Sequence, residues 1–166
     1  IMAGKTTVCL YRELRVALEH PGIHIMFARW TEDGLFGLIV PLWRKICQEV
    51  GVRLEWHAYE QYDELPNGAK IYMRGLKSVD QVLRYSKFRG LTLSRVYGDQ
   101  AEEWPHDVYL EVAGRLSQSG DYPKQITISQ QSVEEGHWIA REFPADNSQM
   151  PHRRYIPLSI HDNAHN

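Results

Sequence analysis

Apolar positions fall in blocks along the chain, and their spacing predicts helices and strands in alternation. Over residues 5–19 they recur at roughly helical intervals, and the His-Pro-Gly of residues 20–22 ends that helix. Residues 23–28 are apolar and bounded by turns, as in a buried strand. A second helix is predicted over residues 35–50, with Pro41 kinking or dividing it.

The blocks that follow continue this alternation. Further strands are predicted at residues 53–59, 69–73, 91–97, 124–129 and 154–160. Further helices are predicted from Ser78 through Leu83, from Pro105 to near Gly120, and over residues 137–143. This order predicts an α/β domain with an open, mainly parallel sheet and helices on both faces. Ligands on such sheets bind at the carboxyl ends of the strands.

Composition and charge narrow the class of protein further. The chain has 166 residues, which fit one domain, and its 43% hydrophobic and 24% charged residues are ordinary for a globular protein. A formal net charge of -2 with dispersed Lys and Arg gives no basic patch for tight, autonomous DNA binding. Cys9 and Cys47 are too few for a disulfide framework, so we expect two buried free thiols. No apolar run reaches the roughly 18 residues of a membrane span, so no membrane partner is expected.

The residues that open the first helix carry the strongest chemical signal. Ala3-Gly4-Lys5-Thr6-Thr7 contains the last three positions of the phosphate-binding loop G-x-x-x-x-G-K-[ST], the Walker A motif. In such a loop, backbone N–H groups and the helix N-terminus bind phosphate oxygens. We expect Lys5 to reach the β- and γ-phosphates of ATP, and the Thr6 hydroxyl to bind Mg²⁺. The first glycine of the loop would precede Ile1, so we expect an internal part of a longer protein that binds ATP weakly by itself.

Two later strands carry polar residues where the phosphate loop would lie. The strand at 91–97 runs into Asp99, and a strand-terminal acid beside such a loop is the Mg²⁺-organising Walker B arrangement. Glu102 and Glu103 follow, and an acidic turn that caps the next helix is the alternative interpretation, above all for Glu103. The strand at 124–129 carries Thr127 and Ser129, hydroxyls of the kind that sense the γ-phosphate in many P-loop ATPases.

Taken in order, these segments resemble the terminase large subunits of tailed bacteriophages. The likeness is carried by residues 27–31, 74–76, 88–103, 107–109, 114–116, 137–143 and 159–166. The resemblance implies a RecA-like P-loop NTPase fold, with ATP and Mg²⁺ as cofactors. It also implies an ATPase that drives double-stranded viral DNA into a procapsid in the host cytoplasm. Its expected partners are the portal protein, the terminase small subunit and further copies in a homo-oligomeric ring on the portal.

The resemblance also assigns roles to single residues. Arg29 and Arg115 become candidates for contacting phosphate, in cis or from a neighbouring subunit, and a structural salt bridge is the alternative for both. The family places a glutamate directly after the Walker B acid, where this chain has Gln100. Either Glu102 or Glu103 therefore substitutes as the base, or Gln100 acts by positioning water alone, or this copy of the ATPase is slow.

The chain also differs from the terminase pattern in two respects, and two other classes of protein remain possible. The family's coupling strand often runs into an Asn-Pro pair, whereas residues 130–132 here are Gln-Gln-Ser. The family's nuclease domain has no counterpart in residues 1–166, which are expected to be a partial ATPase domain without nuclease activity. Another P-loop NTPase, helicase-like or of partition type, and an inert α/β domain remain as alternatives.

Overall fold

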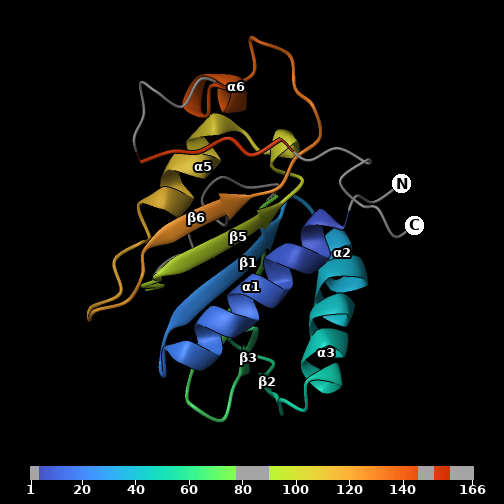
Figure 1. Ribbon diagram of the computed structural model, residues 1–166, viewed down its shortest axis with the longest axis vertical. Coiled ribbons are helices and arrows are strands. Elements are labelled where there is room, and N and C mark those ends of the chain that lie inside the picture. The colour runs from blue at the N-terminus through green and yellow to red at the C-terminus, as the bar shows by residue number, and fades with distance from the viewer. Residues whose placement is uncertain (1–3, 78–89, 146–151, 158–166) are drawn as a thin grey trace.

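A computed structural model of the chain describes residues 4–77, 90–145 and 152–157 (Figure 1). In this part of the chain, six strands form one sheet in the order β2-β3-β4-β1-β5-β6. The strands are β1 (His24–Arg29), β2 (Glu55–His57), β3 (Tyr62–Glu64), β4 (Lys70–Gly75), β5 (Arg95–Asp99) and β6 (Gln125–Ile128). The helices are α1 (Lys5–Glu19), α2 (Glu32–Gly34), α3 (Val40–Glu49), α5 (His106–Ala113) and α6 (Trp138–Glu142).

The centre of the sheet is parallel, as predicted. Strand β1 pairs in parallel with β4 and β5, and β5 pairs in parallel with β6, whereas β2 and β3 are antiparallel at one edge. The strand predicted over residues 53–59 is confirmed only for Glu55–His57, and a turn at 58–61 leads into the unpredicted β3. The middle residue of β3 is the buried Asp63, so this strand has no apolar alternation to reveal it.

Helices cover both faces of the sheet (Figure 1), which confirms the predicted fold class. On one face, α1 and α3 pack on the odd-numbered positions of β1, such as Ile25 and Phe27. On the other face, α5 and α6 pack on the even-numbered positions, such as Met26 and Ala28. Because successive side chains of a strand point to opposite faces, a central strand of this kind must be apolar throughout.

The predicted helix at 35–50 is divided and begins earlier. Thr31 caps α2 by accepting a hydrogen bond from the Gly34 backbone N–H at 3.2 Å. A π-helical turn, Leu35–Ile39, then leads into α3, and Pro41 lies in the first turn of α3. Proline is tolerated in a first turn because the backbone N–H groups there have no partner within the helix, so the missing N–H of proline costs no hydrogen bond.

Three other boundaries differ from the prediction. Helix α5 ends at Ala113, before the predicted end near Gly120, and β5 begins at Arg95, after the predicted start at residue 91. The residues between these boundaries pair with each other: the backbone of Leu93 accepts a hydrogen bond from residue 118 and donates one to residue 115. The predicted strand at 154–160 is wrong for residues 154–157, which are exposed and lie outside any strand of the described sheet. Its last residues, and the helix predicted from Ser78, lie outside the described residues. No helix in the described ranges has the length and apolar character to cross a membrane.

Candidate nucleotide site

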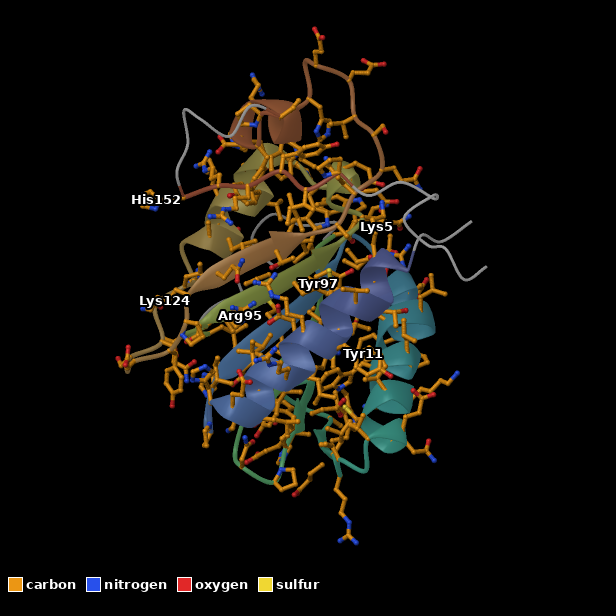
Figure 2. All side chains as sticks on the ribbon, in the orientation of Figure 1. Lys5, Tyr11, Arg95, Tyr97, Lys124 and His152 are labelled. Carbon is orange, nitrogen blue, oxygen red and sulfur yellow. The ribbon has the colours of Figure 1, made fainter. Side chains whose placement is uncertain are left out.

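The beginning of α1 and the carboxyl ends of β5 and β6 meet at one edge of the sheet. Figure 2 shows Lys5 at that end of α1 and Tyr97 between α1 and β5. Parallel strands with right-handed crossovers bring their carboxyl ends together, and α/β proteins bind ligands at this edge. Most of the site residues predicted from the sequence therefore gather in one place.

The described part of the predicted phosphate loop has the backbone conformation that a glycine at this position allows. Gly4 precedes α1 with φ of 70°, a left-handed conformation that glycine adopts without a steric penalty. The Lys5 ammonium donates to the backbone carbonyl of Gln130, just beyond β6, at 2.5 Å. Thr7 lies in the first turn of α1 and is half-buried. Ala3, also predicted to belong to the loop, lies outside the described residues.

Asp99, the last residue of β5, is the centre of the site. It is 6% exposed, and its Oδ1 accepts hydrogen bonds from three hydroxyls. Thr6 donates at 3.0 Å, Tyr97 at 3.0 Å and Ser129 at 2.9 Å. The other oxygen, Oδ2, lies 3.4 Å from Nη1 of Arg29, at the end of β1. Four elements thus converge on one carboxylate, which joins the predicted Walker A and Walker B residues.

Gln100 follows Asp99 in a left-handed conformation with φ of 51°. Its amide oxygen accepts a hydrogen bond from Nη2 of Arg29, so one guanidinium contacts both residues. Glu102 and Glu103 lie on the short 3-10 turn that follows. Glu103 is exposed, whereas Oε2 of Glu102 is buried and has no hydrogen-bond partner among the described residues. These environments separate the two acids, each of which the sequence offered as a substitute base.

Two predicted residues lie away from this centre. Thr127 is in the middle of β6, and its hydroxyl accepts from Nη1 of Arg12 at 3.4 Å. The carbonyl of Arg115 accepts from the backbone N–H of Leu93, before the amino end of β5, so Arg115 lies at the opposite edge of the sheet. Its Nη2 is 3.8 Å from Oε1 of Glu111. A contact between Arg115 and a nucleotide beside Asp99 would have to come from a neighbouring subunit.

Two further features were missed by sequence reasoning. Tyr97 is buried beside Asp99, and burial, then the negative charge of Asp99, raises the pKa of its hydroxyl, which keeps it a proton donor. Arg95 and Glu13 form a buried, two-pronged ion pair, with contacts of 2.6 and 2.7 Å, that ties β5 to α1. Successive side chains of a strand alternate between its two faces, so Tyr97 and Asp99 lie on the same face of β5. This alternation could have indicated from the sequence that Tyr97 lies beside Asp99.

The oxygens gathered here fit a magnesium ion that is bound together with phosphates. Mg²⁺ prefers hard oxygen ligands, and Thr6 and Asp99 provide a hydroxyl and a carboxylate. Within the described ranges, no group of three His, Cys, Asp or Glu side chains could hold a metal by itself. The phosphates of a nucleotide and water would therefore supply the remaining ligands, as is usual for Mg²⁺.

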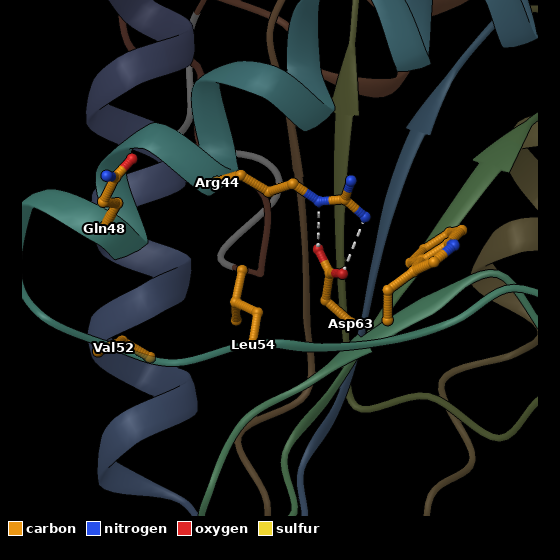
Figure 3. Close-up of a pocket in the computed structure, with 6 residues that line it drawn as sticks. Arg44, Gln48, Val52, Leu54 and Asp63 are labelled. Atoms are coloured by element: carbon orange, nitrogen blue, oxygen red, sulfur yellow. Dashed lines mark hydrogen bonds and ion pairs between the residues drawn. The ribbon is translucent and has the colours of Figure 1, made fainter.

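A separate hollow of about 290 Å³ lies between α3 and the β2–β3 hairpin (Figure 3). Arg44 binds both carboxylate oxygens of Asp63 there, at 3.0 and 3.3 Å, and its guanidinium lies 4.9 Å from the centre of the Trp56 ring. None of the predicted site residues lines this hollow. Its lining residues are Arg44, Gln48, Val52, Leu54, Trp56 and Asp63.

The fold is that of phage DNA-packaging ATPases of known structure. The structure is similar to the large terminase of a thermophilic bacteriophage, with a TM-score of 0.84 and 19% identity over 100% of this chain and 40% of that chain. The same thermophilic-phage terminase in complex with ADP gives a TM-score of 0.80 at 20% identity, over 99% and 39% of the two chains. No protein-family model matches the sequence, and a search of curated proteins finds no match.

Two more distant structures belong to the same group. The HK97 bacteriophage large terminase has a TM-score of 0.61 at 17% identity, over 91% of this chain and 32% of that chain. The N-terminal domain of the phi29 DNA packaging ATPase has a TM-score of 0.56 at 13% identity, over 79% and 70%. At such identities the likeness establishes the fold, and it confirms the RecA-like architecture and the expected structural resemblance to large terminases. The chain spans about two fifths of the thermophilic-phage terminase.

Proposed function

We propose that this chain is the ATPase region of a viral DNA-packaging motor, in which hydrolysis of Mg²⁺-ATP drives double-stranded DNA into a procapsid. The observation that carries the proposal is the hydrogen bond from Thr6 to Asp99 at 3.0 Å. It brings the Walker A and Walker B residues together in a fold shared with packaging ATPases. The similar thermophilic-phage terminase was solved with ADP and with ATP-gamma-S, which supports a nucleotide as the ligand of this edge.

Each residue at the centre has a role that follows from its position. The Lys5 ammonium, now on the carbonyl of Gln130, would transfer to the β- and γ-phosphates of ATP. Thr6 and Asp99 would hold Mg²⁺, which supplies positive charge to the phosphates. Arg29, at the end of β1, would add a second positive charge in cis beside the phosphates.

Activation of water falls to Gln100 and Glu102. The Gln100 amide can orient a water molecule but cannot take its proton, and Arg29 holds that amide in place. Glu102 lies on the turn that directly follows, and its buried carboxylate oxygen Oε2 has no hydrogen-bond partner in the described part of the chain, so Glu102 is the better proton acceptor of the two acids. Glu103 is exposed and is the weaker candidate for this role, and the start of α5, where a capping role was the alternative, has no side-chain cap hydrogen bond.

Coupling of hydrolysis to movement would pass through the end of β6. Ser129 donates a hydrogen bond to Asp99, and the neighbouring Gln130 accepts one from Lys5. Two adjacent residues after β6 therefore contact the predicted Walker B and Walker A residues. When Lys5 moves to a phosphate, the Gln130 carbonyl loses its partner and the segment after β6 becomes free to shift. That segment leads into α6, on the opposite face of the sheet from α1.

The remaining parts of the proposal concern the assembly. The chain would belong to a longer terminase large subunit that works in the host cytoplasm, in a homo-oligomeric ring on the portal protein and with the terminase small subunit. In such a ring Arg115, which lies at the edge of the sheet away from Asp99, would have to leave Glu111 to reach the nucleotide of a neighbouring subunit. Packaging of DNA into procapsids distinguishes this function from that of a helicase-like or partition-type ATPase.

The test is a pair of lysine substitutions in the protein that carries this chain. Lys5→Ala should abolish ATP turnover, measured as phosphate release at saturating ATP, because it removes the charge that reaches the phosphates. Lys45→Ala is the matched control, since the Lys45 side chain is 70% exposed on α3. Both variants should keep the thermal unfolding midpoint of the wild type. Unchanged turnover in a folded Lys5→Ala protein would contradict the proposed function.

A further inference from the structure

One oxygen of Asp99 is fully occupied by the protein itself. The hydroxyls of Thr6, Tyr97 and Ser129 all donate to Oδ1, at 2.9 to 3.0 Å. A carboxylate oxygen has about two lone-pair directions for strong hydrogen bonds, so Oδ1 has no place left for a cation. Any cation that binds Asp99 must approach Oδ2.

The two hydroxyls that do not belong to the phosphate loop are rigidly placed. The Tyr97 ring is buried and meets the edge of Phe27 at 6.1 Å between centroids, and Phe27 meets Trp43 in the same way at 5.1 Å. The Tyr97 oxygen also lies 3.1 Å from the Ser129 oxygen. Tyr97 and Ser129 therefore reach the carboxylate from β5 and β6 as one unit.

The second oxygen, Oδ2, is held much less firmly. Its ion-pair partner is Nη1 of Arg29 at 3.4 Å, longer than the roughly 2.7–2.9 Å of a strong charge-assisted hydrogen bond. The Arg29 guanidinium also contacts the Gln100 amide oxygen and the Gly34 carbonyl. It can therefore leave Oδ2 to another cation and still keep hydrogen-bond partners.

We infer that Tyr97 and Ser129 are positioning residues that turn the Asp99 carboxylate so that Oδ2 is offered to the metal of a metal–nucleotide complex. The arrangement also prepares Thr6, because a hydroxyl that donates its proton to Oδ1 keeps its lone pairs for the same metal. The inference rests on the proposed nucleotide binding and adds to it two residues that act through Asp99.

The experiment measures ADP binding by calorimetry in the protein that carries this chain, once with Mg²⁺ and once with a chelator. In the wild type, Mg²⁺ should tighten ADP binding. In Tyr97→Phe the metal-free affinity should stay within about twofold of wild type, while the gain from Mg²⁺ should fall about tenfold. Tyr109→Phe is the matched control, since Tyr109 is a buried tyrosine on the other face of the sheet and should keep the full gain.

Ser129→Ala removes the second hydroxyl without touching the aromatic core, and it decides the matter if Tyr97→Phe fails to fold. It should also reduce the gain from Mg²⁺ with ADP. A role for Ser129 in sensing only the γ-phosphate would leave ADP binding unchanged, since ADP has no such phosphate. If the folded variants keep the full increase in ADP affinity on adding Mg²⁺, the inference is wrong, but the proposed function still stands. A wild type that binds no ADP in either condition overturns the proposed function, and the inference with it.

Discussion

Two buried aspartates in this sheet are each paired with an arginine, and the two pairs differ in kind. Arg44 binds Asp63 through two nitrogens, at 3.0 and 3.3 Å, one to each carboxylate oxygen (Figure 3). Arg29 approaches only Oδ2 of Asp99, at 3.4 Å, while three hydroxyls bind Oδ1. The aspartates have similar burial, with side chains 1% and 9% exposed.

This difference distinguishes the structural ion pair at Asp63 from the candidate nucleotide site at Asp99. Asp63 has both oxygens satisfied by one guanidinium, so the pair is neutral and complete as it stands. Asp99 is held mainly by neutral donors, which orient the carboxylate without cancelling its charge. A buried negative charge with one weakly held oxygen is suited to gain a divalent cation. Burial and an arginine partner are common to both aspartates, so we propose that the distribution of donors over the two oxygens is what distinguishes the candidate metal-binding carboxylate.

The largest expected effect comes from removing the charge of Asp99. In the protein that carries this chain, Asp99→Asn should lower ATP turnover about a thousandfold, because it removes a metal ligand but keeps the size of the side chain. Asp63→Asn should keep turnover within about threefold and lower only the free energy of unfolding. Phosphate release at saturating Mg²⁺-ATP measures both. Similar losses of turnover in the two variants would contradict the contrast between the two aspartates.

The second effect concerns the acids that follow Asp99. Glu102→Gln should lower turnover about a hundredfold, as expected for loss of a general base, with little change in ADP affinity. Glu103→Gln is the control, because Glu103 is exposed on the same short turn and should retain turnover. If both variants keep full turnover, Gln100 acts by positioning water alone.

Much of the site could be predicted because its geometry follows from chain order. Lys5 and Thr6 begin a helix, Asp99 ends a strand and Ser129 directly follows one, and the parallel sheet brings these ends to one edge. The role of Tyr97 could not be predicted in this way. An aromatic residue inside an apolar strand looks like core, and its hydroxyl becomes functional only through the side chain two positions later.

The less predictable parts of the fold are those where polar contacts decide the structure. Strand β3 is centred on Asp63, whose burial depends on Arg44 from a helix 19 positions earlier in the chain. Helix α5 stops at Gly114, a residue type that commonly ends helices, and the prediction ran past this local signal to Gly120. The residues after Gly114 then bond to the chain before β5, a long-range contact that the sequence does not reveal. Hydrophobic periodicity carries no information about such long-range pairings.

The third effect is on stability and compares the two arginines directly. Arg44→Ala should lower the free energy of unfolding by about 2 kcal/mol, because it leaves Asp63 buried and without its bidentate partner. Arg29→Ala should cost about 1 kcal/mol, since three hydroxyls still bind Asp99. Urea unfolding at neutral pH, monitored by circular dichroism, gives both values. The exposed Arg15, paired with Glu19, is the control and should change stability by no more than about 0.5 kcal/mol on substitution with Ala. A larger loss for Arg29→Ala than for Arg44→Ala would reverse the comparison.

The smallest effect uses the two free thiols, one near each aspartate. Burial, then the charge of Glu13, raises the pKa of Cys9 to about 11, and burial, then the charge of Asp63, raises the pKa of Cys47 to about 12. Both should therefore react slowly with a maleimide at about pH 8, and their rates should rise about tenfold per pH unit while the fold is intact, because only the thiolate reacts.

Cys9 should react before Cys47, since it is partly exposed whereas Cys47 is fully buried. Because both pKa values lie above the unfolded value of 9.0, the folded thiols keep their protons longer than the unfolded ones. The thiols' contribution to stability is thus complete below about pH 9 and is lost as the pH rises toward 11 and 12. Mass spectrometry of labelled peptides assigns the rates to each cysteine, and faster labelling of Cys47 would show that the Arg44–Asp63 region opens more readily than the site around Asp99.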